Sequence, residues 1–335
     1  MQTNSKKNLG KLLLLFFLIF ITILLFINPR MYISSISHGL NVWAIAVLPS
    51  LFPFFIITKT FSALNIIPYE NKFFKILSKI FKVPACGIYI FFMSIISGYP
   101  VGAKLIQEFY SKNIITQKQA TKLITLCSTS GPLFIIGTVG VMFFGSIKIG
   151  VVFLLSHIFG AVCNGLLFRN KITTNTISNN LYFSNTNDKN NNENLLYEIM
   201  LNSILSVLIV GGYIAIFFMI IEMLNSTYLL VPINTLLTKV LSIFNINYKQ
   251  VSAIINGLIE VTNGLNTLSM CSLNSIKKVV ISSLLIGFGG FCVHLQSLTF
   301  LISCKINLKF YFFSKITQSL LSGVIALLLV VIFFI

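Results

Sequence analysis

Long apolar runs recur along the chain, and most of them reach the roughly 20 residues that a helix needs to cross a bilayer. Only 9% of the 335 residues are charged, against roughly 25% in a typical soluble domain. We therefore expect an integral membrane protein. The expected spans are residues 12–28, 40–61, 123–145, 149–168, 199–224, 279–301 and 316–335. Lysines precede the first run and no small-residue cleavage site follows it, so we expect an uncleaved anchor.

Two further apolar stretches, residues 86–110 and 250–271, are each interrupted in the middle by glycine and polar residues. We expect each of them to fold as a re-entrant hairpin. If the first span starts in the cytoplasm, basic residues then favour the cytoplasmic side by roughly three to one, in agreement with the positive-inside rule. The cytoplasmic set includes Lys104, Lys112, Lys305 and Lys315, and the outer set includes Lys249.

An asparagine-rich cytoplasmic linker, residues 169–198, divides the chain into two similar halves. After an N-terminal anchor (1–39), the first repeat covers 40–168 and the second covers 199–335. Each half consists of a span, an amphipathic segment, a hairpin, a broken span and a final span, with opposite starting sides. The prediction is an all-α membrane protein with about seven transmembrane helices and two opposed re-entrant hairpins in an inverted repeat, an arrangement typical of secondary transporters.

The first hairpin turns at Ser97-Gly98-Tyr99, and Pro100 suits the first position of the next helix. That helix directs its N-terminus, the positive end of its dipole, toward the midplane. Lys104 lies one turn further along, so dipole and ammonium together predict an anion site. The alternative is that Lys104 extends to the cytoplasmic interface or pairs with Glu108.

The second hairpin turns at Glu260-Val261-Thr262-Asn263-Gly264. Glu260 is one of only seven acidic residues, and it falls at membrane depth, at the C-terminal end of a half-helix. Because that end carries negative charge, the carboxylate is expected to need a proton, a cation or a lysine partner. We expect Lys104 to neutralise it in the empty protein. A protonated structural glutamate is the alternative.

The two broken spans contribute further polar residues. Non-helical backbone at membrane depth is tolerated where it is buried in protein or lines a water-filled cavity, so four breaks predict a polar cavity. His294 is either a proton relay or a hydrogen-bonded packing residue. The candidate substrate-binding residues are Ser97, Gly98, Tyr99, Lys104, Thr129, Ser130, Gly131, Glu260, Thr262, Asn263, Gly264, Gly289, Gly290, His294 and Gln296.

Four motifs in this order resemble the YlbJ family of sporulation integral membrane proteins: SGYPVGAK (97–104), SGPLFIIGTVG (130–140), EVTNG (260–264) and GFGGFCVHLQ (287–296). The resemblance covers most of the chain from about residue 40. It implies membership of the nucleoside-recognition (Gate) group, related to concentrative nucleoside transporters. It also implies a role in the mother cell of a spore-former, at the outer forespore membrane, moving dipicolinic acid toward the developing spore.

The sequence leaves several functions open. The first is transport of a small anion, with dipicolinate implied by the resemblance and Na⁺ or H⁺ as a coupling ion. A nucleoside or other metabolite transporter and a non-transporting scaffold are the alternatives, and a homo-oligomer is left open. We expect no enzyme, because no nucleophile–base set, metal spacing or phosphate loop occurs. The lysines flank apolar spans, so we expect the lipid bilayer and not a nucleic acid as partner, and the six scattered cysteines predict neither a metal site nor disulfides.

Overall fold

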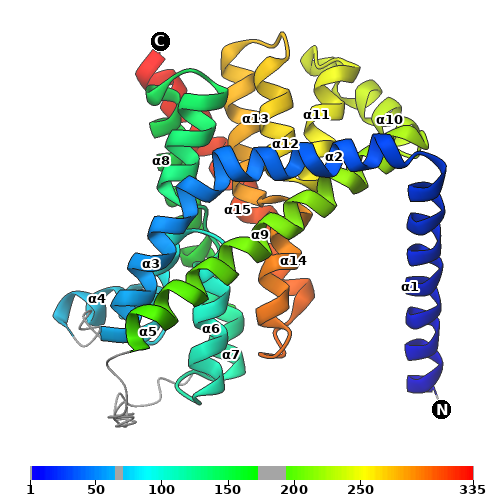
Figure 1. The fold of residues 1–335 in the computed structure, drawn as a ribbon. Coiled ribbons are helices and arrows are strands. Elements are labelled where there is room, and N and C mark those ends of the chain that lie inside the picture. Colours follow the sequence, from blue (N-terminus) through cyan, green and yellow to red (C-terminus); the bar gives the residue numbers. More distant parts are fainter. Residues whose placement is uncertain (1, 65–70, 173–193, 335) are drawn as a thin grey trace.

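The structure, a computed structural model, describes residues 2–64, 71–172 and 194–334, and these contain helices and no strands. An N-terminal helix, α1 (Gln2–Ile27), stands beside the rest of the chain and contacts it mainly through α2 (Figure 1). Much of the predicted linker, residues 173–193, lies outside the described residues.

The first half contains the predicted order of elements. Its first span is a continuous helical stretch, so the predicted boundary at residue 39 falls inside a helix. The elements are α2 (Pro29–Val42), the π-helix η1 (Trp43–Val47), α3 (Leu48–Leu64), α4 (Lys72–Phe81), α5 (Ala85–Ser97), α6 (Val101–Ser111), α7 (Gln117–Leu123), the π-helix η2 (Phe134–Phe143) and α8 (Ile147–Phe168).

The second half repeats this order. It starts with a long helix, continues with a short one, and then has two pairs of helices that are each joined by a single residue. The elements are α9 (Leu195–Ser226), α10 (Val231–Leu241), the 3₁₀ turn η4 (Ser242–Phe244), α11 (Tyr248–Ile259), α12 (Val261–Met270), α13 (Ser275–Phe288), α14 (Gly290–Leu301) and α15 (Leu308–Phe334). Figure 1 shows the α5–α6 hairpin in the lower half of the molecule and the α11–α12 hairpin in the upper half.

Six helical stretches of the described chain are long and apolar enough to cross a membrane, and α4 with α5, bent by 93°, would make a seventh. The predicted span 123–145 is not among them, and here the prediction is wrong. The chain is non-helical from residue 124 to 131, because Pro132 and the polar residues before it do not continue the helix begun by α7. The spans are 10–27, 29–61, 147–168, 195–226, 275–301 and 308–333.

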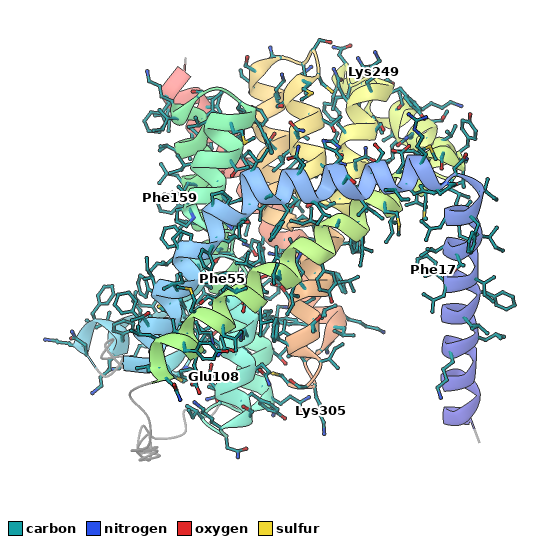
Figure 2. The ribbon with its side chains drawn as sticks, in the orientation of Figure 1. Phe17, Phe55, Glu108, Phe159, Lys249 and Lys305 are labelled. Carbon is teal, nitrogen blue, oxygen red and sulfur yellow. The ribbon has the colours of Figure 1, made fainter. Side chains whose placement is uncertain are left out.

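The distribution of apolar side chains is typical of a protein surrounded by lipid. Phe17 on α1 and Phe159 on α8 are each 49% exposed and point away from the molecule in Figure 2, whereas Phe55 on α3 is 2% exposed. A soluble monomer rarely exposes so many large apolar side chains together. Charged groups lie at the two ends of the molecule, with Lys249 at the upper end and Lys305 and Glu108 at the lower end (Figure 2).

Candidate functional site

The four helix interruptions meet at one cavity between the two halves. The cavity contains about 430 Å³ of space that protein atoms do not fill, including space that is open to solvent. Its polar lining comes from the tips of both hairpins and from both broken spans: Tyr99, Ser130, Gly131, Glu260, Thr262 and Gln296. Its apolar lining comes mainly from η1, α3 and α9, and includes Val47, Leu51, Phe134, Val210, Ile214, Val261 and Val293. We call it the central cavity.

The tip of the first hairpin packs directly against the non-helical stretch before η2. Gly98 has a φ of 74°, and a Cβ atom there would lie 2.4 Å from the backbone nitrogen of Gly131. Only glycine therefore permits this approach. We expect Pro100 at the first position of α6 from the sequence, but in the structure it directly precedes the helix, which begins at Val101. The Ser97 hydroxyl bonds to the Thr58 hydroxyl and so faces α3 and not the central cavity.

Lys315 lies behind this hairpin tip and is completely buried, with 0% exposure. Its Nζ donates to the Tyr99 hydroxyl at 2.8 Å, to the Ser128 carbonyl at 3.1 Å and to Gln318 Oε1 at 2.9 Å. The Tyr99 hydroxyl in turn donates to the Ser128 carbonyl at 2.9 Å. The ammonium thus holds the first hairpin against the first broken span.

The prediction that Lys315 belongs to the cytoplasmic set is wrong. Helix α15 begins at Leu308 and not at residue 316, so Lys315 lies two turns inside the helix. A signal was present in the sequence: Lys315, Gln318 and Ser322 are spaced so that they share one helix face, and all three are buried. No ion pair of Lys315 with an acidic side chain occurs in the described chain. An ionisable residue buried at membrane depth is a candidate for function.

Glu260 is the single residue between α11 and α12 and is 1% exposed. Its carboxylate accepts hydrogen bonds from the backbone N–H of Thr262 at 3.1 Å and of Asn263 at 2.6 Å. The expected meeting with the negative end of a half-helix is therefore wrong. The side chain turns forward and caps the positive N-terminus of α12, which stabilises the carboxylate.

The second broken span brings both hairpin tips together. Gly289 and Gly290, with φ of 92° and 76°, separate α13 from α14. A Cβ atom at Gly289 would lie 3.3 Å from the Tyr99 hydroxyl, and one at Gly290 would lie 3.1 Å from the Val261 nitrogen. The break therefore lies between the two hairpin tips and leaves no room for larger residues.

His294, on α14, does not line the central cavity. Its Nδ1 lies 2.7 Å from the Tyr311 hydroxyl, and its ring packs against Phe288, Phe312 and Tyr311. Gln296, on the same helix, does line the cavity and donates to the Cys292 sulfur at 3.3 Å. The geometry of His294 is that of a hydrogen-bonded packing residue.

The first broken span is held by partners that sequence reasoning missed. The backbone N–H of Ser130 donates to Nε2 of His157 on α8 at 2.9 Å, and the Thr129 hydroxyl bonds to that of Ser94 at 2.9 Å. His157 is isolated in an apolar run, so its sequence context gives no sign of this contact. Ser130 reaches the central cavity, whereas Thr129 points into the protein.

Lys104 lies in a different cavity from Glu260, so the predicted pairing of the two is not seen. Its Nζ donates to the Ser206 hydroxyl of α9 at 3.3 Å. The cavity contains about 320 Å³ of empty space and is lined by Phe55, Thr58, Lys59, Val101, Lys104, Leu105 and Ser206. We call it the lysine cavity.

Two remaining candidates have structural contacts. Gly264 packs on Gly257 where α11 and α12 approach each other, since a Cβ atom there would lie 2.0 Å from the Gly257 Cα atom. The Asn263 side chain accepts from Thr267 one turn further along α12. Neither residue lines the central cavity. In the described part of the chain, no group of three His, Cys, Asp or Glu side chains could hold a metal ion.

The apolar helices and the cavity between two similar halves define a multi-pass, all-α integral membrane protein. The chain is 28% identical to the sporulation integral membrane protein YlbJ of Bacillus subtilis strain 168, over 96% of this chain and 83% of that protein. This similarity supports membership of the YlbJ family, which the four motifs predicted. No family model and no solved structure matches it. The wider relation to nucleoside-recognition proteins stays a prediction.

Proposed function

We propose that this sporulation membrane protein is a transporter that moves dipicolinate across the outer forespore membrane toward the developing spore. The observation that carries the proposal is the meeting of four helix interruptions at one cavity between opposed hairpins. Transporters with inverted repeats bind their substrates at such interruptions near the midplane, and alternate their access between the two sides. The name of the relative supports the sporulation part of this proposal.

The chemistry around the central cavity supports a flat anionic substrate. Tyr99 and Phe134 present aromatic rings to the cavity, and such rings pack well on a planar solute. The buried charge of Lys315 lies directly behind the Tyr99 hydroxyl. Dipicolinate is a planar aromatic dianion at neutral pH. If Tyr99 moves, one carboxylate of the substrate would replace the phenol as a partner of Lys315.

Glu260 favours a second candidate, a nucleoside or another hydroxyl-rich metabolite. Its carboxylate lines the central cavity together with Gln296 and Thr262. Each of these groups accepts hydrogen bonds from hydroxyls. A carboxylate also repels a dianion unless a proton or Na⁺ accompanies it, so dipicolinate transport would require coupling at Glu260.

Flux into proteoliposomes tests the proposal and separates the candidates. Purified full chain is reconstituted, and the uptake of labelled dipicolinate and labelled uridine is measured in parallel, with protein-free liposomes as control. The proposal expects saturable dipicolinate uptake that excess unlabelled dipicolinate inhibits. Uptake of uridine alone would favour the second candidate. No protein-dependent uptake of either would favour a scaffold and contradict transport.

A further inference from the structure

The lysine cavity brings two ammonium groups together, and among the described residues neither forms an ion pair with an acidic side chain. Lys59 comes from α3 and Lys104 from α6, and both line the same enclosed space with the Ser206 hydroxyl. Their like charges repel each other across this space. Two like charges in one partly desolvated site are unfavourable unless a negative group joins them.

The carboxylate of Glu108, on the same helix as Lys104, is already engaged. Glu108 lies one turn beyond Lys104 on α6, and its Oε1 is 3.2 Å from the Nζ of Lys112. In the part of the chain that the structure describes, no acidic side chain forms an ion pair with Lys59 or Lys104. The cavity is therefore lined by two ammonium groups, which suit an oxyanion, while the Ser206 hydroxyl donates to the Asn202 carbonyl at 2.6 Å and accepts from Lys104.

The lysine cavity and the central cavity are both lined by residues of α3 and α9. Val47 in η1 and Leu51 near the start of α3 line the central cavity. Further along α3, the residues Phe55, Thr58 and Lys59 line the lysine cavity. Along α9, Val210 and Ile214 line the first and Ser206 lines the second. The two cavities therefore follow one another along the same pair of helices. The lysine cavity lies on the side of Glu108, at the lower end of the molecule (Figure 2).

The boundary between the two cavities is apolar. Phe55 is buried and lines the lysine cavity, and Val101, the first residue of α6, lines it as well. Val101 directly follows the tip of the first hairpin, whose Tyr99 lines the central cavity, so a movement of that tip would shift Val101 as well.

We propose that Lys59 and Lys104, the second positioned by the Ser206 hydroxyl, form an oxyanion site, where a carboxylate of the solute waits between the lower face of the protein and the central cavity. The claim that this site lies on the path of the solute rests on the proposed transport function. The claim that it binds an oxyanion does not. A lipid phosphate has the same chemistry and would satisfy the same donors.

Binding measurements on the detergent-solubilised full chain test this site. Equilibrium dialysis with labelled dipicolinate compares the native chain with Lys59→Gln, Lys104→Gln and the double variant. Lys118→Gln, which removes an exposed lysine at the same end of the molecule, is the matched control. Charge-conserving Lys104→Arg reports whether a loss comes from charge or from misfolding.

We expect each single glutamine variant to weaken binding at least tenfold, because a desolvated charge interacts more strongly than one in water. Lys104→Arg should retain most of the affinity, and Lys118→Gln should lie within twofold of the native chain. The proposal is overturned if the double variant binds dipicolinate within twofold of the native chain.

Two further comparisons separate the possible failures. If the lysine variants lose binding while the native chain shows no dipicolinate flux, the oxyanion site stands and the transport function falls. If flux is present and the variants bind normally, transport stands and this site falls. Repeating the dialysis in nanodiscs of phosphatidylcholine with and without phosphatidylglycerol identifies the oxyanion. Competition by phosphatidylglycerol that disappears in the double variant would assign the site to a lipid phosphate and overturn its role on the path.

Discussion

The buried contact between Lys315 and Tyr99 makes a quantitative prediction about stability. Tyr99→Phe removes the hydroxyl that accepts from Lys315 and donates to the Ser128 carbonyl. A hydrogen bond to a charged group contributes about 1.5–3 kcal/mol, and a buried charge that loses a partner cannot recover it from water. We expect Tyr99→Phe to lower the free energy of unfolding by about 2–3 kcal/mol.

Lys315→Met should behave differently, although it removes three hydrogen bonds. It also removes a desolvated charge that has no acidic partner in the described chain. Replacing buried ionic groups by apolar ones of similar size is often neutral or stabilising. We therefore expect Lys315→Met to change the free energy of unfolding by less than about 1 kcal/mol. With the charge gone, Tyr99→Phe should lower this free energy by only about 1 kcal/mol more.

The measurement is unfolding by sodium dodecyl sulfate in mixed micelles, followed by far-ultraviolet circular dichroism, for the native chain, both single variants and the double variant. Tyr197→Phe, at an exposed position of α9, is the control for loss of a hydroxyl. The expected coupling between the two substitutions is about 1–2 kcal/mol. If their effects simply add, or if Lys315→Met destabilises more than Tyr99→Phe, then Lys315 is not an uncompensated charge held by the hairpin tip.

Three other predictions follow from the geometry. Glu260→Gln should retain substrate binding but remove any dependence of flux on pH or Na⁺, because the carboxylate that caps α12 is the charged acceptor in the cavity; unchanged dependence in proteoliposomes would make Glu260 structural. Gly289→Ala should lower the free energy of unfolding by about 1–2 kcal/mol because of its positive φ. Thermal unfolding in detergent compares this variant with Gly212→Ala, an unstrained control. Equal effects of the two substitutions would contradict the prediction. Lys112→Cys and Lys249→Cys should react with an impermeant thiol reagent from opposite sides of the membrane, and labelling from one side would contradict the opposed hairpins.

The helix interruptions were predictable because glycine, proline and polar residues inside an apolar run leave few alternatives in a bilayer. The hairpins predicted at 86–110 and 250–271 correspond to helices at 85–111 and 248–270. The local composition of each break determines where the helix ends, and this information is contained in a few adjacent residues.

The directions of the polar side chains were not predictable in the same way. Glu260 lies at the end of one helix and the start of the next, and only the path of the backbone decides which of them its carboxylate caps. The partners of Lys104 depend on how α6 is rotated about its axis, and Ser206 is distant in sequence. The apolar run that predicts the last span begins one residue after Lys315, whereas the helix begins seven residues before it.

The central claim is that the cavity where the four interruptions meet opens in turn to the two sides of the membrane and holds the substrate. Ser130→Cys and Thr262→Cys place thiols on its wall, one from each half of the chain. Their modification in proteoliposomes by an impermeant thiol reagent, added inside or outside and with or without dipicolinate, is the most direct test. Native chain provides the background from its own cysteines. The account predicts that each introduced thiol reacts from both sides and that dipicolinate slows both reactions. Reaction from one side only, at a rate that dipicolinate does not change, would contradict it.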